Sequence, residues 1–180
     1  MYKDIAYMGT THRHNELSLS FFGNLFELIK NRKIVILGEN VSLVHFGRKG
    51  RGEICRLVDI SKFNDIELNK FKSGLINDLE VIQPDFCMFY KNPHCKNERD
   101  TRLAGIPDLI VEVWSESNDE IDIQIKKSLY SESDTEHWYI TQDSNLVECF
   151  IGNQEVKSQS LTDILVTKVG LKFDLRYLAI

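Results

Sequence analysis

The first periodic segment of the chain covers residues 16–30 and repeats apolar residues with a helical spacing. The apolar positions that fall on one side are Leu17, Phe21, Leu25, Leu28 and Ile29. Spacings of three and four residues place such side chains on a single face of a helix. The sequence therefore predicts an amphipathic helix that ends before Asn31, with Asn15 available as its N-cap.

A β pattern follows in residues 34–46, which are rich in β-branched side chains and are broken by Gly38. This pattern predicts two strands, or one strand with a tight bend. From residue 59 to residue 79 the chain is polar with spaced apolar residues. That spacing predicts a weak helix on a polar excursion.

The middle of the chain is patterned for two strands. Residues 81–90 predict a strand with Pro84 near its start, where a missing N–H is tolerated. After a polar, turn-prone segment, residues 107–115 form an apolar run that only Asp108 and Glu112 interrupt. Two strands joined by a loop favour an antiparallel pair.

The last part of the chain alternates between one helical and several strand patterns. Residues 119–131 predict a helix with acidic residues in its first turn. Residues 137–141 and 146–152 predict two strands joined by a turn, and the alternation over residues 169–177 predicts another strand or extended edge. No repeat or linker interrupts these elements, so we expect a single α/β domain over residues 1–180.

Composition narrows the class of protein. The chain has 180 residues, of which 42% are hydrophobic, enough to bury a core without disulfides. We find no apolar run of membrane-spanning length and no signal-peptide pattern, so we expect a soluble, cytoplasmic protein. Four cysteines without a C-x-x-C pair favour reduced thiols over a zinc site. A net charge of -5 argues against tight binding of long DNA, although residues 45–51 form a short basic strip.

Two carboxylates interrupt one face of the second central strand, because residues two apart on a strand point the same way. If the strands pair antiparallel, Asp85 lies across from Glu112 with Cβ atoms about 5 Å apart, close enough to bind one hard cation. Asp108 lies about 13 Å away along the strand, so we expect it to fix the turn near Gly105 and Pro107. The alternative is a solvent-facing sheet side with ordinary solvated acids.

On the following helix, Asp122, Lys126 and Tyr130 are spaced by four residues and share one face. Lys126 can therefore stand above the two carboxylates. The alternative is a local ion pair between Asp122 and Lys126, which the same spacing allows.

Three runs of the sequence carry a family resemblance: residues 81–92, 105–130 and 135–150. They contain Q-P-D followed by a strand, G-x-P-D-L-x-V-E-V, D-x-x-x-K-x-x-x-Y and E-x-W. The matching residues are Pro84, Asp85, Gly105, Pro107, Asp108, Glu112, Ser115, Asp122, Lys126, Tyr130, Glu136 and Trp138. The chain resembles the Uma-two family of restriction endonuclease-like proteins, a domain-of-unknown-function family of the PD-(D/E)xK nuclease superfamily.

The resemblance implies a restriction-endonuclease-like PD-(D/E)xK core, with a mixed central β-sheet flanked by helices and an insertion at about residues 53–80. It also implies Mg²⁺- or Mn²⁺-dependent hydrolysis of DNA. The residues it assigns are Asp85, Glu112 and the backbone carbonyl of Val113 as metal ligands, Lys126 as catalytic group, and His14, Glu16, Asp108, Asp122 and Tyr130 as supporting residues.

The chain departs from the superfamily pattern at Trp114, where a lysine normally follows the glutamate, and the family supplies its lysine from the helix instead. Ser115–Asn118 also differs from the family's usual S-P-S-T and adds negative charge. A catalytically inactive relative that serves as a binding or assembly module is therefore the main alternative. Cleavage of RNA or branched DNA is a third reading, and a homodimer would suit the cutting of two strands.

Overall fold

The computed structural model describes residues 12–26, 30, 35–38, 42–47, 56–76, 79–90, 94–95, 102–115, 118–133 and 135–179. The helices are α1 (His12–Asn24), α3 (Asp65–Lys72) and α4 (Glu120–Ser131), with 3-10 turns η1 (Ile60–Lys62) and η2 (Arg176–Leu178). The strands are β1 (Val35–Gly38), β2 (Ser42–Phe46), β3 (Leu79–Ile82), β4 (Phe86–Phe89), β5 (His94–Cys95), β6 (Arg102–Ala104), β7 (Leu109–Trp114), β8 (Glu136–Thr141), β9 (Leu146–Ile151), β10 (Gln154–Ser160), β11 (Ile164–Val166) and β12 (Lys172–Asp174).

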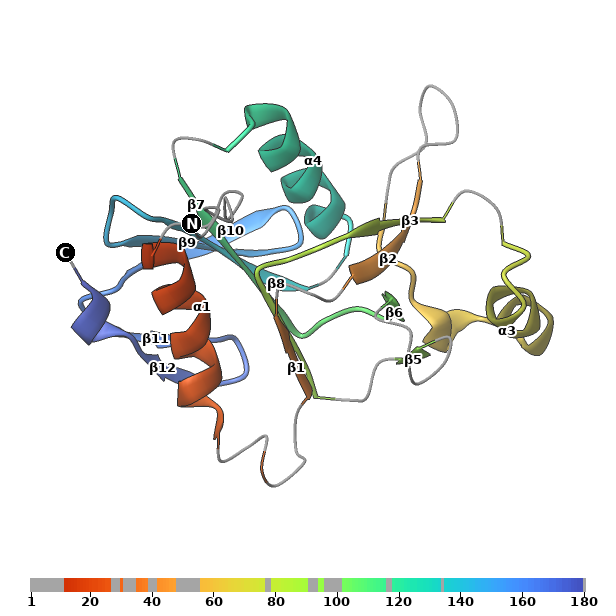
Figure 1. Cartoon of the computed structure of the whole chain (residues 1–180), viewed down its shortest axis with the longest axis horizontal. Coiled ribbons are helices and arrows are strands. Elements are labelled where there is room, and N and C mark those ends of the chain that lie inside the picture. Colours follow the sequence, from red (N-terminus) through yellow and green to blue (C-terminus); the bar gives the residue numbers. More distant parts are fainter. Residues whose placement is uncertain are drawn as a thin grey trace, which may run out of the picture.

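A six-stranded sheet forms the centre of the molecule, with strand order β1-β4-β7-β8-β9-β10 (Figure 1). The β7–β8 pair is parallel and the other neighbours are antiparallel, so the sheet is mixed. The remaining strands make a four-stranded sheet in the order β3-β2-β6-β5 and a β11-β12 hairpin. The predicted α/β class, with a mixed central sheet flanked by helices, is confirmed.

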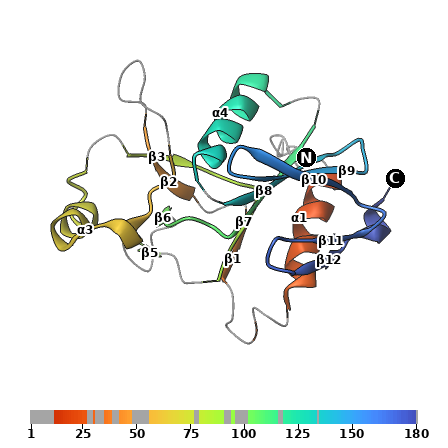
Figure 2. The same cartoon turned by 180° about the vertical axis from the view of Figure 1, so that it is seen from behind.

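Helices cover both faces of the central sheet (Figures 1 and 2). On one face, α1 and the β11-β12 hairpin pack on the apolar residues of β7 that include Leu109, Val111 and Val113. On the other face, α4 and part of the smaller sheet pack around Ile110 and Tyr139. The strict alternation along β7 thus follows the two-residue period of a strand, and it turns Glu112 toward α4.

Helix α1 buries Leu17, Phe21 and Leu25, as its apolar spacing predicts. Its start was predicted wrongly, because the helix begins at His12 and Asn15 lies within it rather than at its N-cap. The predicted apolar positions Leu28 and Ile29 lie outside the described residues.

The segment around Pro84 is not one strand, which corrects the prediction for residues 81–90. β3 ends at Ile82 in the smaller sheet, and β4 begins at Phe86 in the central sheet. Pro84 lies in the crossing between them, where its missing N–H interrupts no ladder. The residues on either side of Pro84 therefore stand where the two sheets meet.

The alternation over residues 169–177 predicted a longer strand than the structure has, and Val169 and Tyr177 are exposed. Phe173 and Leu175 are buried, but β12 covers only Lys172–Asp174 and is followed by the turn η2. β10 and β11 lie before it and were not predicted. The short C-terminal strand is paired only with β11, so it adds a small flap to the core rather than an edge of the central sheet.

Residues 53–80, expected as an insertion, contain in their described part η1, α3 and the start of β3. Helix α3 is short but well capped. The side-chain oxygen of Asn64 accepts the N–H groups of Ile66 and Glu67, and the Glu67 carboxylate accepts the N–H of Asn64. Local capping therefore fixes a helix whose apolar pattern is weak.

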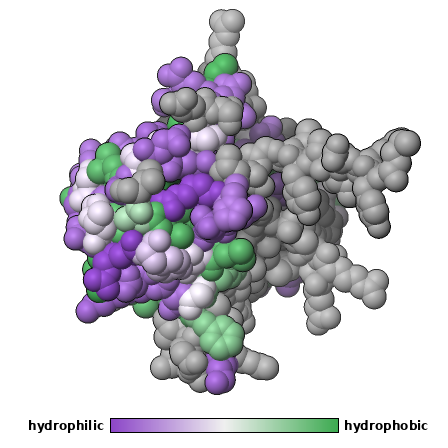
Figure 3. All heavy atoms as spheres, turned by 60° about the vertical axis from the view of Figure 1, so that its left-hand side comes forward, coloured by the Kyte–Doolittle hydropathy of each residue, from purple (hydrophilic) through white to green (hydrophobic). Residues whose placement is uncertain are grey.

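The face seen in Figure 3 is mainly hydrophilic, with apolar side chains in separate spots among the residues that are coloured. No helix within the described ranges is both long enough and apolar enough to cross a lipid bilayer. Cys87 and Cys149 are buried free thiols, as expected for core cysteines. Cys55 and the side chain of Cys95 are outside the described part.

Candidate active site

The strand register brings Asp85 and Glu112 together. β4 and β7 are antiparallel, with Phe86 opposite Val111, so the next position along the ladder sets Asp85 opposite Glu112. Asp85 Oδ2 accepts a hydrogen bond from the N–H of Val113 at 2.7 Å, which ties the crossing segment to β7. The predicted antiparallel pairing of these two strands is confirmed.

Glu112 has no exposed surface, and each of its carboxylate oxygens has a partner. Tyr130 Oη donates to Oε1 at 2.6 Å, and Lys126 Nζ donates to Oε2 at 2.5 Å. Burial raises the pKa of Glu112 from 4.5 to about 7, although the Lys126 charge opposes this and the Asp85 charge adds to it. A carboxyl group with such a pKa sits near the middle of its titration at neutral pH.

Helix α4 presents Lys126 and Tyr130 to the sheet from positions four residues apart. Asp119 caps the helix by accepting from the Ile121 N–H, which fixes where the first turn begins. The Lys126 ammonium also donates to the carbonyl of Gln83 at 3.1 Å. The ion pair found for Lys126 is therefore with Glu112 on β7, rather than the local pair with Asp122 that the spacing also allowed; Asp122 is exposed.

Asp108 lies at the opposite end of β7. Its Oδ2 accepts the N–H of Tyr90 at 2.7 Å, and its own N–H donates to the carbonyl of Met88 at 2.8 Å. These contacts close the end of the β4–β7 pair. We expected a structural contact here, but the partner is the backbone after β4 rather than the turn around Gly105 and Pro107.

Of the two predicted N-terminal residues, only Glu16 has a side chain in the described part of the chain. The side chain of His14 is outside the described residues, although its backbone belongs to α1. Glu16 Oε1 lies 3.3 Å from His12 Nδ1, one turn away at the helix surface. In the expected basic strip, His45 is a buried residue of β2, and residues 48–51 are not described.

Two residues beside the carboxylates were not predicted. Gln83 contributes its carbonyl to Lys126, and no sequence signal identifies a backbone acceptor. Tyr139 stands next to Glu112 in the parallel β7–β8 register, and its buried hydroxyl has no hydrogen-bond partner in the described part of the chain. Burial raises the pKa of Tyr139, and the charge of Glu112 adds to this effect. The strand pattern around Trp138 indicated that Tyr139 points to the opposite face from Trp138. The sequence did not indicate that β7 is the neighbouring strand.

Aromatic rings anchor the neighbouring lysine. Lys127 Nζ lies 5.0 Å from the ring centroids of both Trp114 and Tyr139, and 3.9 Å from the Glu148 carboxylate. The Trp114 and Tyr139 rings are stacked with centroids 4.3 Å apart. Lys127 therefore links α4 to the sheet by cation–π contacts, whereas the neighbouring Lys126 forms an ion pair with Glu112.

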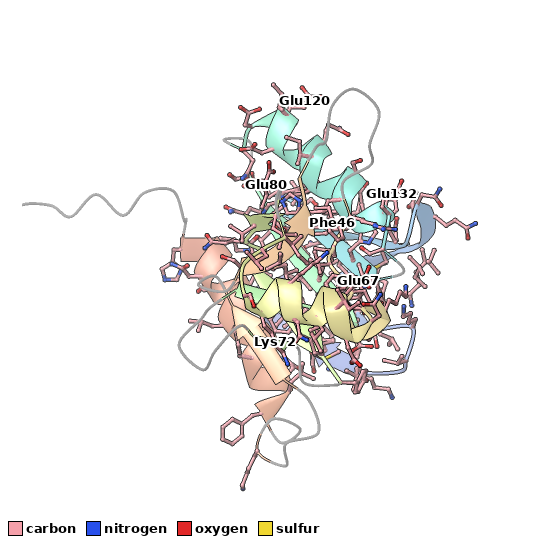
Figure 4. The ribbon with its side chains drawn as sticks, turned by 90° about the vertical axis from the view of Figure 1, so that its right-hand side faces the viewer. Phe46, Glu67, Lys72, Glu80, Glu120 and Glu132 are labelled. Atoms are coloured by element: carbon pink, nitrogen blue, oxygen red, sulfur yellow. The ribbon has the colours of Figure 1, made fainter. Side chains whose placement is uncertain are left out.

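A separate open cavity of about 520 Å³ lies at the far end of α4. Figure 4 shows Phe46 between Glu132 at the end of α4 and Glu67 on α3. The lining is Phe46, Arg56, Leu57, Asp59, Lys62, Phe63, Glu67, Ile106, Glu132 and Ser133. Three of these residues carry carboxylates and two carry cationic side chains, so the cavity has no excess of positive charge for a phosphate.

The donor set around Glu112 suits a hard divalent cation. Two carboxylates from opposed strand positions are present, and Mg²⁺ commonly binds through one or two carboxylates while it keeps several waters. The described residues contain no group of three or more histidine, cysteine or acidic side chains placed to hold a metal. The two carboxylates fit Mg²⁺ or Mn²⁺ in ligand type.

Comparison with known proteins gives two findings. The model of the Uma2 family, described as "Putative restriction endonuclease", matches residues 70–178, which is more than half of the chain. A crystal structure titled as a "putative nuclease belonging to DUF820" from Anabaena variabilis has a TM-score of 0.57 at 12% identity, covering 95% of this chain and 84% of that one. At this identity the likeness shows the fold. No curated protein matches the chain.

Proposed function

Because the chain belongs to the Uma2 family of restriction endonuclease-like proteins, we propose that it is a metal-dependent nuclease that hydrolyses DNA at the Asp85–Glu112 pair. The observation that carries this proposal is the buried Glu112 carboxylate with a lysine ammonium 2.5 Å away. Burial raises the pKa of Glu112 even with Lys126 beside it, so the charged group lowers stability in the middle of β7, and this favours a functional role.

In this proposal, Asp85, Glu112 and the carbonyl of Val113 hold Mg²⁺ or Mn²⁺. The ion supplies Lewis acidity toward the scissile phosphate and lowers the pKa of a bound water. The side chains have distinct tasks that follow from their contacts. Tyr130 holds Glu112 Oε1, and the Val113 N–H holds Asp85 Oδ2, so both carboxylates have fixed orientations.

Lys126 supplies the positive charge that offsets the negative charge developing on the phosphate in the transition state. Its side chain is 23% exposed, so the ammonium lies at the boundary between the buried carboxylate and solvent. That boundary is where a phosphate group of a large substrate can approach.

The test is cleavage of plasmid, single-stranded and branched DNA, and of RNA, by purified protein with Mg²⁺ or Mn²⁺. Lys126→Met should remove nearly all cleavage, whereas Lys127→Met, a neighbouring lysine that contacts aromatic rings instead, should keep it. Equal activity in both variants would reject Lys126 as the catalytic group. Cleavage of RNA alone would change the substrate but keep the site.

A catalytically inactive binding or assembly module is the second candidate. It is favoured by the fact that both oxygens of Glu112 already have protein partners and by the net charge of -5. Absence of cleavage on every substrate, in wild-type protein that is free of contaminating nucleases, would select this candidate.

A further inference from the structure

The Lys126 ammonium lies in a small cation-binding cradle. It contacts two oxygens from different segments of the chain: Glu112 Oε2 at 2.5 Å and the carbonyl oxygen of Gln83 at 3.1 Å. Asp85 follows Gln83 by two residues, and its carboxylate accepts the N–H of Val113, the residue after Glu112. A carboxylate oxygen, a carbonyl oxygen and a second carboxylate nearby are the kinds of ligand that a hard divalent cation takes.

These contacts decide which carboxylate oxygen of Glu112 a metal ion can reach. Oε1 accepts from Tyr130 within the buried core, so it points away from solvent. Oε2 faces the boundary where Lys126 is 23% exposed. A divalent ion that approaches from solvent must therefore bind Oε2, the oxygen that the ammonium already occupies. Two cations that share one oxygen repel each other at this distance.

We propose that Lys126 and the divalent ion compete for the Glu112–Gln83 cradle, so that metal binding displaces the lysine toward solvent. This inference rests on the proposed function, since it concerns the same metal site. Asp122 gives the displaced ammonium a second partner, because it lies one helical turn before Lys126 and its carboxylate is exposed. The lysine then has two alternative positions: on Glu112 without metal, and on Asp122 with it.

The consequence for catalysis is an order of events. Metal binding releases the Lys126 ammonium from a buried carboxylate and moves it outward, to the side from which a phosphate arrives. Lysine suits this role because its charge sits on a flexible four-carbon stem. The local ion pair that the sequence allowed and the Glu112 pair that the structure shows thus become two states of one residue.

The experiment measures Mn²⁺ binding to the full chain at pH 8, where protons compete least for the carboxylates. Binding is monitored by calorimetry and by the loss of the EPR signal of free Mn²⁺. Lys126→Met should bind Mn²⁺ more tightly than wild type, by about tenfold, because the competing positive charge is gone. Lys127→Met should bind like wild type. Circular dichroism confirms that each variant is folded.

A second pair of variants keeps Lys126 in place. Asp122→Asn should weaken Mn²⁺ binding about twofold by removing the partner of the displaced ammonium, a size typical of an i,i+4 pair. Glu120→Gln, which removes an exposed charge from the same helical turn, should change binding less. This comparison decides the question if Lys126→Met does not fold.

The outcomes separate the inference from the proposed function. Measurable binding that is equal or weaker in Lys126→Met overturns the competition and leaves the metal site standing. If Lys126→Met does not fold, equal Mn²⁺ binding by Asp122→Asn and Glu120→Gln likewise overturns the competition and leaves the metal site standing. If neither wild type nor any folded variant binds Mn²⁺, the metal site itself is rejected, and the competition with it.

Discussion

The buried carboxyl of Glu112 should make the protein less stable as the pH rises, and Glu112→Gln should remove that dependence. The group has an ordinary pKa of 4.5 when unfolded and a pKa of about 7 in the fold, where burial is the largest cause of the change. A folded-state pKa above the unfolded one means that folding takes up a proton. The stability this gives is complete below pH 4.5 and is lost as the pH rises through 7.

The size of the effect follows from the two pKa values. Their difference corresponds to about 3 kcal/mol, at about 1.4 kcal/mol for each pKa unit. Most of it, about 2 to 3 kcal/mol, falls between pH 5 and pH 8. For a domain of this size the same change is roughly 5 to 10 °C in melting temperature.

The assay is urea denaturation of wild type and Glu112→Gln at several pH values from 5 to 8, with a chelator present. Other groups titrate equally in both proteins, so the difference between their unfolding free energies isolates Glu112. We expect wild type to lose about 2 to 3 kcal/mol relative to the variant as the pH rises over this range. Glutamine keeps one acceptor for Lys126 or Tyr130, so the variant should fold.

The control is Glu148→Gln, which removes a carboxylate on the same face of the sheet that is 42% exposed and pairs with Lys127 at 3.9 Å. Solvent screens this pair, so the difference from wild type should stay within about 0.5 kcal/mol at every pH. A Glu112 difference that does not change with pH would refute the reasoning. A difference that grows in favour of wild type at high pH would mean that the Lys126 ion pair outweighs burial.

Three further predictions concern other groups. Burial lowers the pKa of His137 from 6.5 to about 4, so wild type should lose about 3 kcal/mol relative to His137→Phe as the pH falls from 6.5 to 4 in urea titrations; no difference would contradict this. Asp85→Asn should abolish Mn²⁺ binding in calorimetry yet melt like wild type, because an amide oxygen still accepts the Val113 N–H. Asp108→Ala should lower stability by about 1 kcal/mol through the loss of the Tyr90 N–H bond, while DNA cleavage persists; unchanged stability would show that this bond contributes nothing.

Glu112 breaks the pattern that the rest of β7 follows, in which the buried residues are apolar. Its neighbours on β7 are apolar and buried, and a glutamine would keep an acceptor there without the loss of stability at neutral pH. Positions where a residue breaks the local pattern and lowers stability, even with its partners in place, are where function is expected. The predicted gain in stability of Glu112→Gln at pH 8 measures how much stability the buried Glu112 carboxylate costs the protein.

Local periodicity was enough to predict β7 and α4, the elements that carry Glu112, Lys126 and Tyr130. The two-residue period of β7 indicated that Glu112 shares a face with Ile110 and Trp114, and the four-residue spacing on α4 indicated that Lys126 and Tyr130 point together. The antiparallel hairpin then placed Asp85 opposite Glu112. These conclusions depend only on neighbours in sequence or on one strand pairing, so residue spacing is sufficient to predict them.

Tertiary packing decided what the sequence left open. Spacing on α4 gave Lys126 two partners, Asp122 or Glu112, and only the packing of the helix on the central sheet selected Glu112. Nothing local indicated that the chain changes sheets at Pro84 and so turns the Gln83 carbonyl toward the same ammonium, or that β8 runs beside β7. Periodicity fixes which way a side chain points along its own element, whereas the group it meets depends on elements that pack from distant parts of the chain.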